Sequence, residues 1–123
     1  MANEITFTIS MSRQHVTVTA DSHTFPVVRK LITQTGTGQD DRKHTIGTSE
    51  ESITFTDIPT NGYCILQNLD ATNYVEWGGS TGVYVGRMKA SETAGPFRIN
   101  PGAILYLRAN TAACKVRIIH YED

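Results

Sequence analysis

This chain of 123 residues lacks most of the features that assign a function at sight. Its apolar runs stay well below the roughly 20 residues that span a bilayer. Its first residues, Met1–Glu4, have neither the basic nor the apolar region of a secretory signal peptide. Its formal net charge is only -1, so no strong field attracts nucleic acid or an anionic membrane. We therefore expect a single folded domain over residues 1–123, with neither nucleic acid nor a membrane as partner.

Cysteine is scarce, and neither copy has a second cysteine close by in the sequence. Cys64 and Cys114 both fall in expected strands. They could be neighbours and form a disulfide, although free buried cysteines are common and nothing in the sequence points to secretion. Either one could also pair with His120 as a nucleophile. Alternation places Cys114 on the same face as Val116 and Ile118, however, which favours an inert core thiol.

Local clusters of metal-binding or catalytic side chains are also missing. Asp70 and Glu76 lie near expected loops or strand ends but form no Asp-x-Asp-x-Asp calcium loop. The glycines of Gly78–Gly82 do not precede a helix that could bind phosphate. We therefore expect a non-enzymatic protein without catalytic residues, metal ligands or cofactors. The four histidines occur singly, without zinc-binding spacing: they are His15, His23, His44 and His120.

Apolar and polar residues alternate in many short segments. In Ile5–Met11 every second residue is apolar, which predicts a strand with one buried face, and Arg13–Ala20 repeats the pattern. Turns such as Pro59–Gly62 separate about ten such segments at intervals of roughly 8–12 residues, whereas Gln34–Arg42 is expected to be a long polar loop. Ile53–Ile58 is expected to be a strand. The pattern predicts an all-β, two-sheet antiparallel sandwich, jelly-roll-like as the first choice and immunoglobulin-like as the second.

The most continuously apolar segment is Tyr63–Asp70, and the other strands can be arranged around it. Side chains alternate along a strand, so Cys64 and Leu66 point to one face. Tyr63 and Ile65 then point to the other face. A strand that is apolar on both faces is usually central and covered on both sides. The sequence therefore predicts that a second sheet or another chain covers each face.

Tyrosines, a tryptophan and basic residues gather in the second half of the chain. Their most ordinary role is packing within the sandwich and solvation of its surface. Tyr and Trp are also enriched at interfaces, so the same residues could contact an acidic partner surface or provide a platform on which sugars stack. The candidate interface residues are Tyr74, Trp77, Tyr84, Arg87, Tyr106, Lys115 and Arg117.

Five segments of this half are Gly47–Glu51, Asn68–Gly78, Gly86–Glu92, Phe97–Gly102 and Leu105–Val116. Together they resemble segments of small virion proteins of tailed bacteriophages. The similarity covers roughly residues 46–123, and the segments that carry it occur in the same order. It implies a non-enzymatic structural protein of the virion, assembled in the host cytoplasm, with the major capsid protein or another virion protein as partner. It carries over no catalytic or metal-binding residue.

Within this group the first expectation is a capsid decoration (cement) protein that binds the outer capsid surface and stabilises the shell. A tail or tail-fibre component is the alternative within the same class. A host-glycan-binding module, with Trp77, Tyr84 or Tyr106 as stacking platforms, is the alternative from another class. The apolar outer face expected for the central strand needs a cover, and a symmetric homo-oligomer, most simply a trimer, would provide one.

Overall fold

The computed structural model describes residues 3–13, 23–55 and 57–123 of the chain. Every regular element in those ranges is a β-strand, and all strand pairs are antiparallel. The all-β class expected from the alternation is therefore confirmed. The chain forms two compact units, Met1–Gln34 and Thr35–Asp123.

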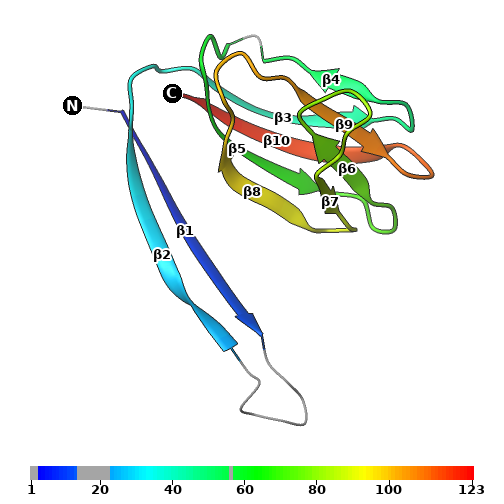
Figure 1. Cartoon of the computed structure of the whole chain (residues 1–123), viewed down its shortest axis with the longest axis horizontal. Coiled ribbons are helices and arrows are strands. Elements are labelled where there is room, and N and C mark those ends of the chain that lie inside the picture. The colour runs from blue at the N-terminus through cyan, green and yellow to red at the C-terminus, as the bar shows by residue number, and fades with distance from the viewer. Residues whose placement is uncertain (1–2, 14–22, 56) are drawn as a thin grey trace. The chain divides into compact units, whose positions relative to one another are not determined.

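The first unit is a two-stranded hairpin. Strand β1 (Asn3–Arg13) pairs with β2 (His23–Gln34), so that Ile5 lies opposite Ile32 and Ile9 opposite Val28 (Figure 1). The register shifts once, between Ile9 and Met11. The strand predicted over residues 13–20 lies outside the described residues, apart from Arg13 at the end of β1.

The prediction that one face of this first strand is buried was wrong for the single chain. Ile9 is 36% exposed, Met11 is 66% exposed and their neighbour on β2, Val28, is 42% exposed. The physical reason is the size of the sheet, because two strands alone cannot cover their own apolar face and an isolated hairpin is marginally stable in water.

The second unit is a sandwich of two four-stranded sheets that share one core (Figure 1). The first sheet has the order β3 (Gln39–Ile46), β10 (Cys114–Glu122), β5 (Asn61–Asn68) and β8 (Thr93–Arg98). The second has the order β4 (Glu51–Ile53), β9 (Leu105–Ala109), β6 (Val75–Gly78) and β7 (Gly86–Met88). This strand order is compatible with a jelly roll, and the jelly-roll topology stays a prediction. The expectation that the whole chain forms one domain also stays a prediction.

The core lies between the inner faces of the two sheets, and the segment Tyr63–Asp70 supplies its central strand. β5 is bonded to β10 on one side and β8 on the other. Its residues Cys64 and Leu66 are fully buried in the core, while Tyr63 and Ile65 on the outer face are only half-buried. Only one face of β5 is therefore fully covered, whereas the sequence predicted that both faces would be.

The edge strand β3 begins at Gln39, inside the segment expected to be a polar loop. Its alternation was hidden because the residues facing the sandwich margin, before Ile46, are polar. Among them, Arg42 donates from Nη2 to the Thr54 carbonyl across 2.6 Å, and His44 lies 2.9 Å from a Glu51 carboxylate oxygen. These contacts connect β3 to the β4 region. Charged residues that point inward on an edge strand also discourage strand pairing with another chain.

The strand expected over Ile53–Ile58 is much shorter, because β4 ends at Ile53. Ile58 is still buried, so its apolar side chain contributes to the interior from a loop.

The two cysteines are free and buried. Cys64 lies opposite His120 on β10, whereas Cys114 lies at the other end of the same strand. Six positions along a strand correspond to about 20 Å, and a disulfide joins Cα atoms at most about 7 Å apart. The register therefore excludes the open possibility of a Cys64–Cys114 disulfide in this fold.

Candidate interaction surface

The outer face of the β4–β9–β6–β7 sheet collects polar and aromatic side chains. On β9, half-exposed Arg108 lies between the buried residues Leu107 and Ala109. On β7, half-exposed Arg87 precedes Met88, which is only 1% exposed. Alternation along each strand thus separates core from surface. We use the name Tyr–Arg face for Glu50, Tyr74, Glu76, Tyr84, Arg87 and Arg108.

Glu76 stands at the centre of this face. In the strand register it lies opposite Arg87 on β7 and opposite Arg108 on β9. Arg87 donates from Nη2 to Glu76 Oε1 across 3.2 Å, and Arg108 donates from Nη2 to Oε2 across 2.8 Å. One carboxylate therefore holds two guanidinium groups, each from a neighbouring strand. The Glu76 side chain is only 15% exposed, whereas those of the arginines are 52% and 44% exposed.

Each arginine also lies over a tyrosine ring. The Arg87 guanidinium carbon is 4.0 Å from the centre of the Tyr74 ring, and that of Arg108 is 4.6 Å from the centre of the Tyr84 ring. A cation over an aromatic face is attracted by the ring quadrupole. The stacking restricts the arginine side chains while leaving about half of their surface in solvent.

Glu50 holds Tyr84 from the other side. The Tyr84 hydroxyl donates a hydrogen bond to Glu50 Oε2, and the Gly82 amide donates to the same oxygen across 2.7 Å. The residues of the Tyr–Arg face thus form a continuous series of contacts, from Tyr74 through the arginines and Glu76 to Glu50.

These contacts favour the charged forms of Glu50 and Glu76 and the neutral form of the Tyr84 phenol. The hydrogen bond from Arg108, aided by that from Arg87, holds the pKa of Glu76 below its ordinary value. The hydrogen bond from the Tyr84 hydroxyl lowers the pKa of Glu50, and the same bond raises the pKa of Tyr84. At neutral pH the face therefore carries two carboxylates and two guanidinium groups, without a net charge.

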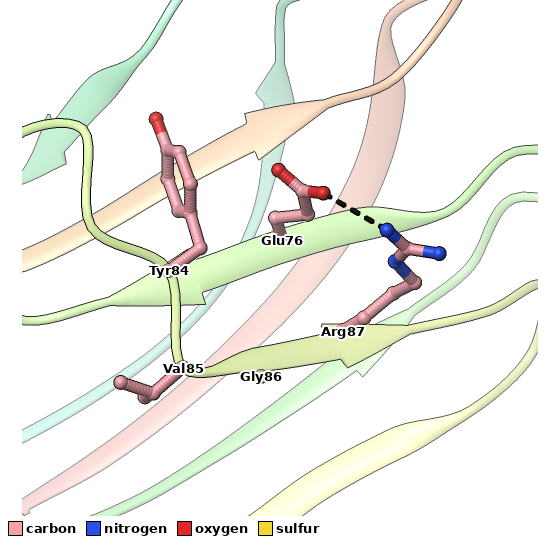
Figure 2. Close-up of a pocket in the computed structure, with 5 residues that line it drawn as sticks. All are labelled: Glu76, Tyr84, Val85, Gly86 and Arg87. Carbon is pink, nitrogen blue, oxygen red and sulfur yellow. Dashed lines mark hydrogen bonds and ion pairs between the residues drawn. The ribbon is translucent and has the colours of Figure 1, made fainter.

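A shallow pocket of ≈ 210 Å³ opens beside this series (Figure 2). Figure 2 shows Tyr84, Glu76 and Arg87 projecting to the same side of the sheet, with Val85 directed away from them. Val85 is 73% exposed. The polar groups are thus accompanied by an apolar side chain that is open to a partner. Gly86 completes the lining.

Three of the seven predicted interface residues lie on this face: Tyr74, Tyr84 and Arg87. Tyr106 is half-buried on β9, where alternation places it on the same side of the sheet as Arg108. Lys115 and Arg117 lie on the other sheet, in β10. There Arg117 donates to both carboxylate oxygens of Asp41, across 3.0 and 2.9 Å.

Trp77 lies on the core side, in the packing role that is most ordinary for such residues and not in its alternative role at the surface. Its ring stacks on Phe97 with the centroids 5.0 Å apart and the planes 3° apart, and both rings pack against the hydrophobic core. The reason is the register of β6, which places Trp77 opposite buried Leu107. A tryptophan held in this way cannot provide an open platform for sugar stacking.

Sequence reasoning did not include Glu50, Glu76 and Arg108 among the interface residues. Alternation alone could have placed Glu76 and Arg108 on the outside of their strands. It could not show that β6 lies between β7 and β9, which is what brings both arginines to one carboxylate. Glu50 lies outside the strands and reaches Tyr84 across 34 sequence positions.

Cys64 and His120 lie opposite each other, but they do not form an activated nucleophilic pair. Burial raises the pKa of the Cys64 thiol to about 12. Burial also lowers the pKa of His120 to about 4, against the opposing effect of the Asp40 charge. His120 Nε2 accepts a hydrogen bond from the Gly62 amide across 3.1 Å. Both side chains are therefore neutral in the core at neutral pH.

The described parts of the chain contain no group of three or more His, Cys, Asp or Glu side chains that could hold a metal ion. Among the described residues, no helix has the length and apolarity of a membrane span.

Comparison with known proteins adds no assignment. No protein-family model matches the chain, and neither a curated protein nor a solved structure matches it.

Proposed function

We propose that this chain is a non-enzymatic structural protein of a tailed-bacteriophage virion, a capsid decoration protein that binds the outer surface of the shell. The observation that carries the proposal is the Tyr–Arg face, in which Arg87 and Arg108 are fixed over tyrosine rings yet remain about half exposed. Tyr and Arg are the residues that most often dominate binding energy at protein interfaces.

The arrangement lowers the entropic cost of binding. A free arginine side chain loses rotamer freedom when a partner fixes it. Here Glu76 and the tyrosines already restrict both arginines, and each guanidinium has donors that no bond to Glu76 uses. Carboxylates on the capsid surface can accept hydrogen bonds from these donors. Val85, which lines the same pocket but is directed away from the polar groups, adds exposed apolar area at its edge.

The segments that resemble virion proteins contribute most of this face. Tyr74 and Glu76 belong to Asn68–Gly78, Arg87 to Gly86–Glu92 and Arg108 to Leu105–Val116. The resemblance and the surface therefore point to the same part of the chain. A copy bound across neighbouring capsid subunits would add buried area between them and raise the temperature at which the shell opens.

The proposal is tested by binding to heads from which the protein is absent. Purified chain is mixed with heads of a deletion strain of the phage that encodes it, and the bound fraction is measured by sedimentation. We expect Arg87→Ala combined with Arg108→Ala to weaken binding at least tenfold. Lys115→Ala, on the other sheet, is the matched control and should change binding less than twofold.

Two results would contradict the proposal. One is an absence of binding to heads at saturating concentration, and the other is equal loss of binding in the double variant and the control. Binding to isolated tails instead of heads would support a tail component. Binding of the wild-type chain to a glycan array, but to neither particle part, would favour a host-glycan-binding module.

A further inference from the structure

The outer face of the β3–β10–β5–β8 sheet has an apolar end and a basic end. At the apolar end, Ile119 on β10 lies opposite Ile65 on β5. In the next outward row, Tyr121 lies opposite Tyr63. All four side chains are half-buried, whereas the residues that alternate with them, such as Ile118, are fully buried in the core. Alternation therefore places a compact apolar block on the outside of the sandwich.

The basic end begins two positions earlier in β10. Arg117 lies opposite Lys43 on β3, and Lys115 is the next outward residue of β10. Like charges directly opposite each other in an antiparallel pair destabilise it. Asp41 is bonded to Arg117 across 3.0 and 2.9 Å, and the Lys43 charge acts on it only at longer range. Both lysines are exposed, and neither forms an ion pair with a carboxylate of the described residues.

The charge of this face has the opposite sign to that of the whole chain. Four cations and two anions belong to the face, whereas the chain has a formal net charge of -1. Arg98 pairs with Asp123 across 2.7 Å and lies over the Tyr63 ring, 4.6 Å from its centre. The excess positive charge is therefore carried by the two lysines of the basic end. The charged residues of the face are Lys43, Arg98, Lys115, Arg117, Asp41 and Asp123.

We infer that this face binds an acidic, partly apolar segment of another protein. The apolar side chains of the segment lie over Ile65 and Ile119, and its carboxylates lie at Lys43 and Lys115. Charge complementarity selects an acidic occupant. The inference concerns the sheet opposite the Tyr–Arg face and does not rest on the proposed function.

The apolar block selects a protein segment among acidic occupants. An inorganic anion has no apolar part that could cover the isoleucines. A nucleic acid carries a negative charge at every nucleotide, but the cation at the apolar end, Arg98, is already paired with Asp123. A protein segment can place apolar side chains at one end and carboxylates at the other, as protein interfaces combine an apolar centre with a polar rim.

The length of the face sets the length of the segment. Lys115 and Tyr121 lie at the two ends of the outward row of β10, and the strand between them extends about 20 Å. An extended segment of about seven residues reaches from one end to the other. We therefore expect short peptides to reproduce the interaction.

The first test measures the binding of fluorescein-labelled peptides of about seven residues to the full-length chain by fluorescence anisotropy. The probe has leucines in one half and glutamates in the other, and it is made in both orders. One comparison peptide replaces the leucines with serines, and another replaces the glutamates with lysines. We expect the better of the two probes to bind at least tenfold more tightly than either comparison peptide.

The second test locates the bound probe on the chain. Lys43→Ala combined with Lys115→Ala should weaken binding of the probe at least tenfold. Lys30→Ala combined with Lys89→Ala is the matched control, because it removes the same charge from two exposed lysines elsewhere in the chain. The control should change binding less than twofold. Circular dichroism spectra of both double variants check that they fold.

A further pair of variants tests the apolar end. Ile119→Thr should weaken binding of the probe at least threefold, because it removes apolar area from the block. Ile104→Thr, at an isoleucine that is 48% exposed in the loop before β9, should leave binding unchanged.

Several results would overturn the inference. Absence of probe binding up to about 1 mM would exclude the segment as occupant. Equally tight binding of the serine–glutamate peptide would reduce the face to a site for anions alone. Equal weakening by the two pairs of lysine variants, or by the two threonine variants, would place the probe elsewhere. Tighter binding of a single-stranded DNA oligonucleotide with the same net charge as the probe would assign the face to nucleic acid.

Discussion

Arg108 on β9 donates from Nη2 to Oε2 of Glu76 on β6 across 2.8 Å, and the two residues are direct partners in the strand register. This pair, with Arg87 on the opposite side of Glu76, fixes the centre of the Tyr–Arg face. The Glu76 side chain is only 15% exposed. This network is therefore better shielded from solvent than an isolated ion pair on the surface.

Glu76→Gln should weaken this network without changing the fold. The glutamine keeps one acceptor oxygen but loses the charge, so we expect a loss of about 0.5–1 kcal/mol in the free energy of unfolding at pH 7. Because the arginines lower the pKa of Glu76 from 4.5, the wild-type advantage is present above that value. It should shrink as the pH falls below it and protonates Glu76. Urea denaturation at pH 7 and pH 3.5 measures the difference, with Asp57→Asn on an exposed loop as control.

Replacing Asn68 should destabilise the fold more than replacing most other polar residues. It is fully buried, and its Nδ2 donates to the carbonyls of Asn73, Met88 and Lys89 at 2.8, 3.2 and 3.1 Å. Asn68→Ala leaves these three carbonyls without their donor, and the bond to the Met88 carbonyl is fully buried. We expect a loss of about 2–4 kcal/mol in the free energy of unfolding.

Chemical denaturation of Asn68→Ala and of Asn100→Ala, an exposed asparagine, measures this effect. The control should lie within about 0.5 kcal/mol of the wild type. If the two variants lose the same small amount of unfolding free energy, the hydrogen bonds of Asn68 do not stabilise the fold as described.

Gly86 should be required for the packing of Trp77. A Cβ atom added at Gly86 would lie 2.2 Å from an atom of the indole ring, whereas a Cβ atom at Gly79 would meet nothing within 4 Å. Gly86→Ala must therefore displace Trp77 from its stack on Phe97, with a loss of about 1–3 kcal/mol from overpacking. Since Trp77 is the only tryptophan, its fluorescence emission reports the displacement directly. Gly79→Ala should leave the emission and the stability unchanged.

Stability should fall in mildly acidic solution because His120 is buried in its neutral form. Its pKa falls from 6.5 to about 4 in the folded chain. Between these values the unfolded chain binds a proton that the folded chain does not, so stability is fully present above about 6.5 and decreases as the pH falls towards 4. We expect a loss on the order of 2 kcal/mol over this range.

Urea denaturation at pH 7.5, 6, 5 and 4.5 measures the pH effect, and His120→Asn provides the comparison. The charged or titratable groups near His120 are Asp40, which lies opposite it on β3, and Cys64, which lies opposite it on β5. A pH dependence of equal size in the variant would assign the effect to other groups.

The sequence was most informative where one face of a strand is buried. The alternation of Cys64 and Leu66 predicted the inner face of β5, and that of Cys114, Val116 and Ile118 predicted the inner face of β10. These strands lie inside a sheet, where burial requires an apolar pattern. In edge strand β3, the residues from Lys43 onward were expected to form a strand, whereas Gln39–Arg42 was expected to be a loop because charged residues take the inward positions there.

The candidate surface could be predicted only in part, because it depends on which strands are neighbours. Tyr74, Tyr84 and Arg87 stood out by residue type. Trp77 stood out for the same reason, but the register directs it into the core. The hairpin shows the converse case, in which the alternation of β1 marked an apolar face whose residues Ile9 and Met11 are 36% and 66% exposed among the described residues.

The most direct test of the central proposal is quantitative mass spectrometry of purified phage particles after heads and tails have been separated. The capsid decoration account predicts that the chain follows the heads, at hundreds of copies per particle. Recovery with the tails at a dozen copies or fewer would contradict decoration and favour a tail component. Absence from both fractions would contradict a virion role altogether.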